Sequence, residues 1–278
     1  TQNVSHYPFE PKGNKSVQWQ ALKLARNLDL VRQADWVMPF DCDEFLCLPD
    51  GYTSVKDLTQ RVCAQGPTDA IALPWRFFGA DGQVARQPGL TPDRFLRAAP
   101  EDLAFPMAWL FKTLHRPKAF RQLGVHRPRR KPDTTPVWRI ANGRQLPSGF
   151  AQNDAAISLF GVPHAAETAR LNHYSLRSLD EFIVKRTRGL PNHMDREIGA
   201  TYWAERNWNT VEDRSISPML AATRQWVDHL LIIPDIAAAH QHCTDCFEAR
   251  LERAMGDIDL LRLHFRLQFL RDSTPPSR

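Results

Sequence analysis

Trp36–Leu48, WVMPFDCDEFLCL, is the stretch on which the expected fold of this chain depends. The apolar run 36–40 ends abruptly in the acidic segment 41–44, and a second apolar run, 45–48, follows before Pro-Asp-Gly at 49–51 breaks the chain. Three carboxylates within four residues repel one another, and burying them without a partner costs several kcal/mol. A bound cation is the simplest way to relieve that cost. The alternative is a solvated acidic turn, which often follows a strand.

The spacing of Asp41 and Asp43 favours the cation. The two residues alternate along what is predicted to be the end of a buried strand, so both side chains point to the same side of it. Carboxylates arranged in this way offer hard oxygen ligands to Mg²⁺ or Mn²⁺ and leave other coordination positions to water and phosphate. The sequence therefore predicts a divalent metal site at Asp41 and Asp43.

The composition is that of an ordinary globular protein, with 278 residues, 42% of them hydrophobic and 24% charged. This length allows one large domain or two small ones. The net charge of +5 fits an anionic small ligand or a loose contact with a membrane surface, and no nucleic-acid recognition motif is present. Five scattered cysteines argue against a disulfide framework and favour a reducing compartment. No signal peptide or membrane-spanning run is visible, so we expect a cytoplasmic protein, at most at the inner face of the membrane.

Helical and strand-like patterns alternate along the chain. Helical spacing of apolar residues predicts helices at 16–34, 53–63, 92–97 and 179–189, with Ser16 and Ser178 as N-caps, and a helical pattern from Pro218 onward. Short apolar runs predict strands at 36–40, 70–78, 110–114, 120–125, 137–140 and 171–174. A helix that leads into a buried strand ending in carboxylates is typical of an α/β protein. Ligands of such sheets gather at the carboxyl ends of the strands, where Asp41 and Asp43 are expected.

Two other features invite a functional interpretation that the local sequence does not support. Cys243 and Cys246 form a single CxxC within a helical pattern and lack a second ligand pair at the spacing that zinc needs, so no zinc site is predicted. Trp203, Trp208 and Trp226 are expected to pack in the core rather than to form a platform for a sugar, although aromatic rings also stack on sugars.

Six segments resemble, in order and spacing, the bacterial glycosyltransferase-2-like group related to glycosyltransferase family 92. They are WVMPFDCDEFLCL, ALPWRFFGADG, TPDRF, KTLHRP, GVHRP and LNHYSLRSLDEFIVKRTRG. The specific part is the pairing of DCDEF with the downstream NHYS and EFIVKRTRG segments, because a DxD alone is common in acidic turns. The resemblance covers about residues 1–215 and implies a GT-A fold, an α/β mixed sheet flanked by helices. It also implies a nucleotide-sugar donor, most simply a UDP-sugar, and inverting transfer to an acceptor hydroxyl.

The resemblance also implies roles for individual residues. Asp43 would be the firmer ligand of Mn²⁺ or Mg²⁺, and Asp41 would contact the metal or the ribose of the donor. Such enzymes often use a late histidine as a further metal ligand, which corresponds to His173, with His126 as the alternative. Asp93 lies where relatives carry the catalytic base, which must reach the acceptor hydroxyl.

Glycines and cations complete the expected donor site. Gly79 and Gly82 match a turn that lies against the donor sugar and the acceptor. Lys112 and Arg127 are expected to bind the donor, since the departing diphosphate needs positive charge near it; Arg129, Lys185 and Arg188 are further cations of this kind.

Each of these residues also has a structural alternative. Asp93 follows Thr-Pro and fits the first turn of a helix, and His173 fits a core histidine that is bonded to backbone. Lys185 and Arg188 fit a charged helix end, where cations interact favourably with the helix dipole.

One departure from the family concerns the start of the chain. Family members begin with a strand and a helix that form part of the nucleotide pocket, and nothing precedes Thr1 in this sequence. We therefore expect a GT-A-like domain at 1–215 that is truncated at its N-terminus, followed by a helical extension at 216–278. The alternative function is a degenerate or truncated module that binds a glycan or a protein partner without turnover. A Mg²⁺-dependent phosphohydrolase is less favoured, because no nucleophile motif such as DxDxT is present.

Overall fold

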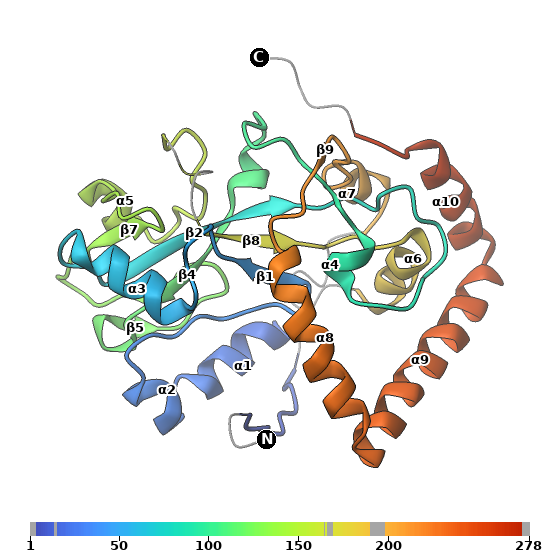
Figure 1. Ribbon diagram of the computed structural model, residues 1–278, viewed down its shortest axis with the longest axis horizontal. Coiled ribbons are helices and arrows are strands. Elements are labelled where there is room, and N and C mark those ends of the chain that lie inside the picture. The colour runs from blue at the N-terminus through green and yellow to red at the C-terminus, as the bar shows by residue number, and fades with distance from the viewer. Residues whose placement is uncertain (1–3, 14–15, 164, 166–168, 190–197, 274–278) are drawn as a thin grey trace.

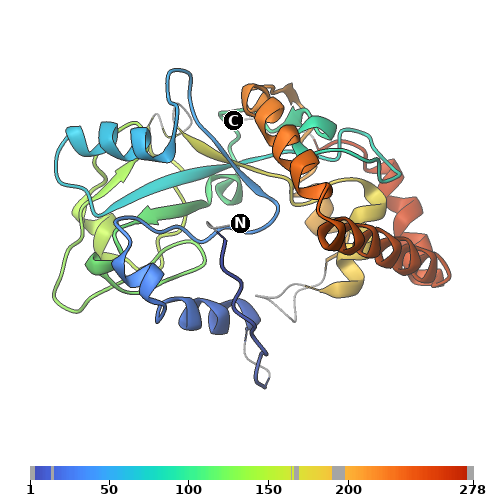
Figure 2. The same ribbon diagram turned by 60° about the horizontal axis from the view of Figure 1, so that its bottom comes forward.

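The computed structural model describes residues 4–13, 16–163, 165, 169–189 and 198–273 (Figure 1). It is a mixed α/β structure in which helices flank a mixed sheet and the C-terminal region is helical. Most of the strands and helices lie where the sequence predicts them. In both views the helices that follow residue 178 gather around one end of the sheet, and the first three helices lie around the other end (Figures 1 and 2).

Strand β2 (Ala70–Phe77) is the centre of the sheet. It pairs with β4 (Phe111–His115) in antiparallel fashion, and with β7 (Trp138–Ile140) and β8 (Arg170–His173) in parallel fashion. Strand β1 (Glu44–Cys47) pairs antiparallel with β8, on the edge of β8 that faces away from β2. Every residue of β2 except Trp75 is buried, as a nearly continuous apolar run predicts for a strand that is covered on both faces.

The predicted strand at 36–40 is wrong. Within this run only Val37 forms a bridge, by exchanging two backbone hydrogen bonds of 2.9 Å with His115 at the edge of β4. Pro39 lacks the N–H that a longer pairing would need, and Phe40 is half-exposed. The strand begins instead at Glu44, so the acidic residues precede a strand, and Asp41–Asp43 form the turn that leads into it.

The N-terminal helices begin at serine caps. Ser16 accepts a hydrogen bond from the first turn of α1 (Val17–Ala25), and Ser54 does so for α3 (Val55–Ala64). The single helix predicted at 16–34 is split, because Leu28 adopts an extended conformation before α2 (Asp29–Gln33) begins.

The remaining elements of the first 215 residues are short. They are the helices α4 (Thr91–Arg94), α5 (Ser148–Gln152) and α7 (Ala200–Ala204), the 3-10 turns at Pro106–Trp109 and Pro117–Ala119, and the two-stranded pairs β3 (Arg97–Ala98) with β9 (Val211–Glu212) and β5 (Phe120–Gln122) with β6 (Arg129–Arg130).

Helix α6 (Leu179–Arg188) links the sheet to the C-terminal helices. Ser178 and Glu181 form a reciprocal capping box at its start, and Gly189 ends it with a positive φ. The C-terminal helices are α8 (Ser217–Leu231), α9 (Pro234–Met255) and α10 (Ile258–Phe269). The apolar face of α6 packs in one core with side chains from α7, α9 and α10, among them Phe182, Tyr202, Trp203, Ala254 and Leu267.

Of the three tryptophans expected in the core, Trp203 and Trp208 are buried and Trp226 is 64% exposed on α8. Among the helices that the structure describes, none combines the length and the hydropathy that crossing a bilayer requires.

Candidate functional site

The two aspartates of the DxD segment have different partners. The Oδ2 atom of Asp41 lies 2.7 Å from the ammonium of Lys112, and its Oδ1 accepts a 2.7 Å hydrogen bond from Gln18 of α1. Lys112 is fully buried on β4, so its charge depends on carboxylates for compensation. The ammonium of Lys112 is thus directed at the acidic turn.

Glu44 anchors this turn to the core. Its side chain is fully buried, and its Oε1 accepts a 2.9 Å hydrogen bond from the indole of Trp75 and lies 3.4 Å from the ammonium of Lys112. The backbone N–H of Asp41 donates to its other oxygen. Burial raises the pKa of Glu44, and the charge of Lys112 opposes that rise. The carboxylate therefore fixes the backbone at the start of β1.

Asp43 is held more loosely. Its Oδ2 lies 3.3 Å from the ammonium of Lys185 on α6, and its Oδ1 lies 3.7 Å from Nε2 of His173 on β8. Burial alone would raise the pKa of Asp43, but His173, Lys185 and Arg177 outweigh it and hold the pKa well below its usual range. Asp43 is therefore an ionised carboxylate whose two contacts are long for hydrogen bonds.

The sheet register explains why Asp43 and His173 meet. Glu44 is opposite His173 in the β1–β8 ladder, so the residue before Glu44 lies at the end of β8. The backbone carbonyl of Asp43 accepts a 2.8 Å hydrogen bond from the N–H of Tyr174. This bond holds the backbone of Asp43 next to the end of β8. The pairing of DCDEF with NHYS in the sequence thus corresponds to a spatial contact.

Aromatic rings hold the two candidate histidines. The ring of Trp75 lies 4.2 Å from that of His173 and 5.0 Å from that of His126, measured between centroids. Nδ1 of His126 faces the carbonyl of Phe111 at 3.0 Å, and burial, aided by the charge of Lys112, lowers the pKa of His126 to about 4. His173 contacts Asp43 directly, whereas His126 is engaged with backbone. Nδ1 of His173 is buried without a hydrogen-bond partner in the described part of the chain.

A cleft of about 330 Å³ opens beside Asp43, between α6 and α9. These two helices lie next to each other in Figures 1 and 2. Cys42, Asp43 and the 174–177 segment line it on the sheet side. From α6 it is lined by Glu181, Val184, Lys185 and Arg188, and from α9 by His240, Cys243, Thr244, Phe247 and Arg250. Both sets recur every three or four residues, so each helix presents one face to the cleft.

The cleft is strongly basic. Arg86, Arg177, Lys185, Arg188 and Arg250 line it, against the carboxylates of Asp43 and Glu181. Glu181 is engaged elsewhere, because it caps α6 and forms a 2.6 Å ion pair with Arg94. An arrangement of this kind attracts anions, and its size lies within the range of small-molecule sites.

The residues at Asp43 fit a metal ion only in part. Asp43 and His173 supply oxygen and nitrogen ligands of the types that Mn²⁺ accepts. Nε2 of His173 faces Asp43, whereas the buried Nδ1 has no partner among the described residues of the kind that usually orients a metal-binding histidine. Among the residues that the structure describes, no group of three or more His, Cys, Asp and Glu side chains is placed to hold a metal. Mg²⁺ sites often use one or two carboxylates and take the remaining ligands from water and substrate phosphates, and the pair fits a site of that kind.

Asp93, the expected catalytic base, lies in α4 and faces a different helix. Its carboxylate forms a bidentate ion pair with Arg224 of α8, at 2.5 and 3.2 Å. Asp93 is not one of the described residues that line the cleft.

The glycine turn is held by side chains from a distant loop. The backbone N–H of Ala80 donates to Asn207 and that of Asp81 to Asn209, each at 2.8 Å. A Cβ at Gly79 would collide with the side chain of Asn209, and Gly82 has φ +68°. Both glycines thus have structural reasons for their presence, and neither is among the described residues of the cleft.

Arg127, expected to bind the donor, is buried. Its guanidinium donates to the carbonyls of Phe150, Ala151 and Ala156 and stacks on the ring of Trp138, with the guanidinium carbon 4.0 Å from the ring centroid. Burial lowers its pKa to about 10. The guanidinium holds the 150–156 loop against the sheet.

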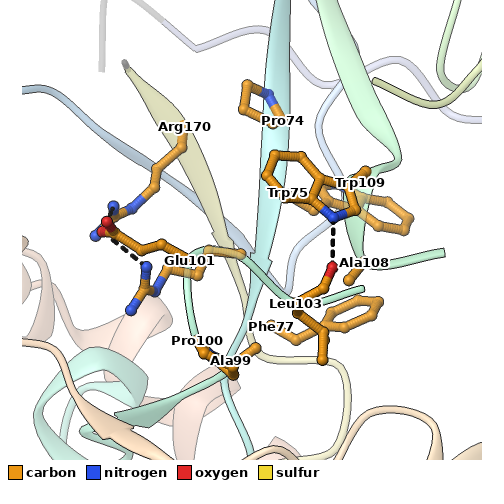
Figure 3. Close-up of a pocket in the computed structure, with 11 residues that line it drawn as sticks. Pro74, Trp75, Phe77, Ala99, Pro100, Glu101, Leu103, Ala108, Trp109 and Arg170 are labelled. Carbon is orange, nitrogen blue, oxygen red and sulfur yellow. Dashed lines mark hydrogen bonds and ion pairs between the residues drawn. The ribbon is translucent and has the colours of Figure 1, made fainter. Parts of the chain in front are cut away.

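A second, smaller hollow lies behind Trp75 (Figure 3). Trp75, Phe77 and Trp109 form one wall, and the ion pairs of Glu101 with Arg76 and Arg170 form the other. With about 30 Å³ it has room for little more than a water molecule.

Most residues of the cleft were not predicted from the sequence, among them the five on α9 together with Arg86, Arg177 and Ser175. The signal for α9 is the spacing of His240, Cys243, Thr244, Phe247 and Arg250, which places them on one helical face. That spacing does not reveal which element the face meets.

Comparison of the chain with known proteins adds no assignment. No model of a protein family, no curated protein and no solved structure matches it.

Proposed function

We propose that this chain is a metal-dependent, inverting glycosyltransferase that moves a sugar from a nucleotide-sugar donor to an acceptor hydroxyl. The observation that carries the proposal is the meeting of Asp43, His173 and Lys185 at the side of a basic cleft. An ionised carboxylate and a histidine beside several cations suit the binding of a diphosphate together with a divalent ion.

In this proposal Asp43 and His173 would hold Mn²⁺ or Mg²⁺, with Asp41 close by in the same turn. The ion would neutralise the charge that develops on the departing diphosphate. Lys185 already donates to the carbonyl of Ser175 at 2.7 Å, which keeps its ammonium at the cleft. Its charge would stabilise the same leaving group.

The transfer also needs a base. The acceptor hydroxyl loses its proton to a carboxylate while its oxygen bonds to the anomeric carbon and the bond from that carbon to the diphosphate breaks. Asp93 is our candidate, on the strength of the family resemblance. It would have to leave Arg224 and approach the cleft, so the Asp93–Arg224 pair would be a resting state.

The test uses the purified chain, a panel of nucleotide-sugars beginning with UDP-sugars, and Mn²⁺ or a chelator. Thermal shift should show stabilisation by nucleotide that requires metal, and a release assay should detect free nucleoside diphosphate. Asp43→Asn should abolish both signals. Asp35→Asn, which changes an exposed carboxylate immediately before the Trp36–Leu48 stretch, should leave them intact. Metal-independent stabilisation, or an unchanged response in Asp43→Asn, would contradict the proposal.

The second candidate is a binding module without turnover. The Asp93–Arg224 pair favours it, because the carboxylate of the candidate base is engaged by a cation. Arg224→Gln separates the two functions. An enzyme with Asp93 as base keeps or gains turnover when its carboxylate is released, and loses turnover in Asp93→Asn. A binding module retains nucleotide-dependent stabilisation in both variants and releases no product in either.

A further inference from the structure

The face of α9 that meets the cleft carries a cation with no evident structural task. Arg250 lines the cleft and, within the described residues, has no carboxylate partner. Arg253, on the same helix and outside the cleft, is engaged with the helix backbone, because its guanidinium donates to the carbonyl of Ala249 at 3.1 Å. Arg253 is thus held at the surface of its own helix, whereas Arg250 faces a cavity.

The opposite wall repeats this pattern. Lys185 and Arg188 are one turn apart on the cleft face of α6. Lys185 is engaged by Asp43 and by the carbonyl of Ser175, whereas Arg188 has no carboxylate partner in the described part of the chain. Each helix thus contributes one guanidinium without a counter-charge to the same cavity.

The third cation at the rim is only weakly compensated. Arg86 lies over the ring of Phe247 on α9, at 5.1 Å from the ring centroid, and is 4.0 Å from the nearest oxygen of Glu248. Stacking on an aromatic ring positions a guanidinium and leaves its N–H groups available for hydrogen bonds.

Cations gathered in one cavity repel one another unless an anion joins them. Guanidinium groups bind phosphate and carboxylate oxygens in bidentate geometry, which suits an oxyanion better than a halide. The alternative, a solvated helix face, accounts for one such arginine on one helix. Arg188 and Arg250 are both exposed, and the oxyanion is favoured over that alternative because the two arginines lie on two facing helices and line one cavity.

We propose that Arg250 of α9 and Arg188 of α6 clamp an oxyanion group of the substrate, so that the C-terminal helices form part of the binding site. The clamp lies in the same cleft as the proposed glycosyltransferase site. The proposed function is needed only to say which substrate carries the oxyanion. The oxyanion is either a phosphate of the donor or a carboxylate or phosphate of an acidic acceptor, and the experiment distinguishes these sources.

The experiment is titration calorimetry of the whole chain, without metal, using inorganic phosphate, inorganic diphosphate and glucuronate as probes. Arg250→Gln should weaken the binding of the oxyanion that fits by about tenfold or more, and the double change with Arg188→Gln by about a hundredfold. Arg250→Lys keeps the charge but loses the bidentate geometry of the guanidinium, so its affinity should fall between those of the wild type and Arg250→Gln. Arg253→Gln is the matched control and should bind like the wild type.

The outcomes separate cleanly. If the wild type binds diphosphate and Arg250→Gln binds it more weakly, the clamp is supported and its ligand is a phosphate group. If only the binding of glucuronate is weakened in this way, the ligand is a carboxylate. Binding that is equal in the wild type and in Arg250→Gln, or absent with all three probes, overturns the clamp. A thermal midpoint of Arg250→Gln within about a degree of the wild type excludes a folding defect. Because no metal and no turnover are involved, failure to detect sugar transfer would leave this result unaffected.

Discussion

Two aspartates, the partly buried Asp43 and the buried Asp213, have different surroundings in this molecule. Asp213 lies 2.5 Å from Arg170 and 2.9 Å from Arg76, and its other oxygen accepts hydrogen bonds from the backbone N–H and the hydroxyl of Ser215. Both oxygens are therefore saturated. Asp43 has only the longer contacts with Lys185 and His173 and borders a cleft.

The pKa of each aspartate is held below its usual range in spite of burial, so the direction of the shift does not distinguish them. Their hydrogen bonding does. A carboxylate with saturated oxygens fixes the structure around it, whereas one with long contacts can exchange them for a ligand. We therefore regard the Asp213 network as structural and the Asp43 cluster as the proposed binding site.

The largest expected effect on stability comes from the saturated network. Asp213→Ala removes a carboxylate that the buried Arg76 shares with Arg170. It leaves the two guanidiniums with the exposed carboxylate of Glu101 as the ion-pair partner they still share. We expect the free energy of unfolding to fall by about 3–5 kcal/mol, measured by urea denaturation. A loss under about 1 kcal/mol would mean that Glu101 alone is a sufficient partner and that the network is not closed.

The glycine turn should behave as part of the same rigid region. In Gly79→Ala the new methyl group meets the side chain of Asn209, which also holds the N–H of Asp81. Overpacking of this kind costs up to about 3 kcal/mol in the free energy of unfolding. Gly149→Ala is the control, because a Cβ there meets nothing within 4 Å, and it should be neutral or slightly stabilising. A mild effect of Gly79→Ala would show that the Asn209 loop shifts to make room and that the turn is not part of the rigid region.

Acid provides a test that separates histidines from carboxylates. Burial lowers the pKa of His115 to about 4, so the folded state keeps this ring neutral while the unfolded chain takes up a proton below about 6.5. The contribution of His115 to the free energy of unfolding is therefore fully present above pH 6.5 and is lost as the pH falls towards 4. The loss is on the order of 2 kcal/mol at pH 5. The carboxylates Asp43 and Asp213, whose pKa values are lowered, lose their contributions only below about pH 4.

His115→Phe should flatten the dependence of the free energy of unfolding on pH between 6.5 and 4, because the ring lies edge-on to Phe120 and a phenyl group retains that contact. Urea denaturation at several pH values measures the slope. An unchanged slope would assign the acid sensitivity to other groups, with His126 first among them.

The smallest effect on stability is expected at the proposed binding site. Asp43→Asn replaces two long contacts, and we expect the free energy of unfolding to change by about 1 kcal/mol, less than in Asp213→Ala. Binding of metal and nucleotide should nevertheless be lost. A destabilisation as large as that of Asp213→Ala would show that Asp43 is a structural residue and would remove the contrast between the two aspartates.

Much of the fold follows from local patterns. The apolar run of β2 and the N-cap of α6 at Ser178 depend on near neighbours in the chain, and both were predicted. The contact between Asp43 and His173 was expected from the family resemblance, and the β1–β8 register produces it.

The rest depends on tertiary packing that local patterns do not encode. The strand predicted at 36–40 failed because Pro39 and the single bridge at Val37 limit its pairing. The pairing of Asp93 with Arg224 joins helices far apart in sequence. The orientation of α9 towards the cleft is set by contacts such as Ala254 in the core with α6, which a helical period alone does not locate.

The way α9 reaches the cleft restricts how its sequence can change. His240 and Arg250 contact the cavity only because they share a rotational phase on the helix, and Ala254 fixes that phase by packing in the core. Inserting one residue between Arg250 and Ala254 would rotate the cleft face by about 100°, whereas inserting a whole turn of three or four would nearly restore it. Relatives of this chain should therefore vary freely at the solvent-facing positions of α9 and differ in length there only by whole turns.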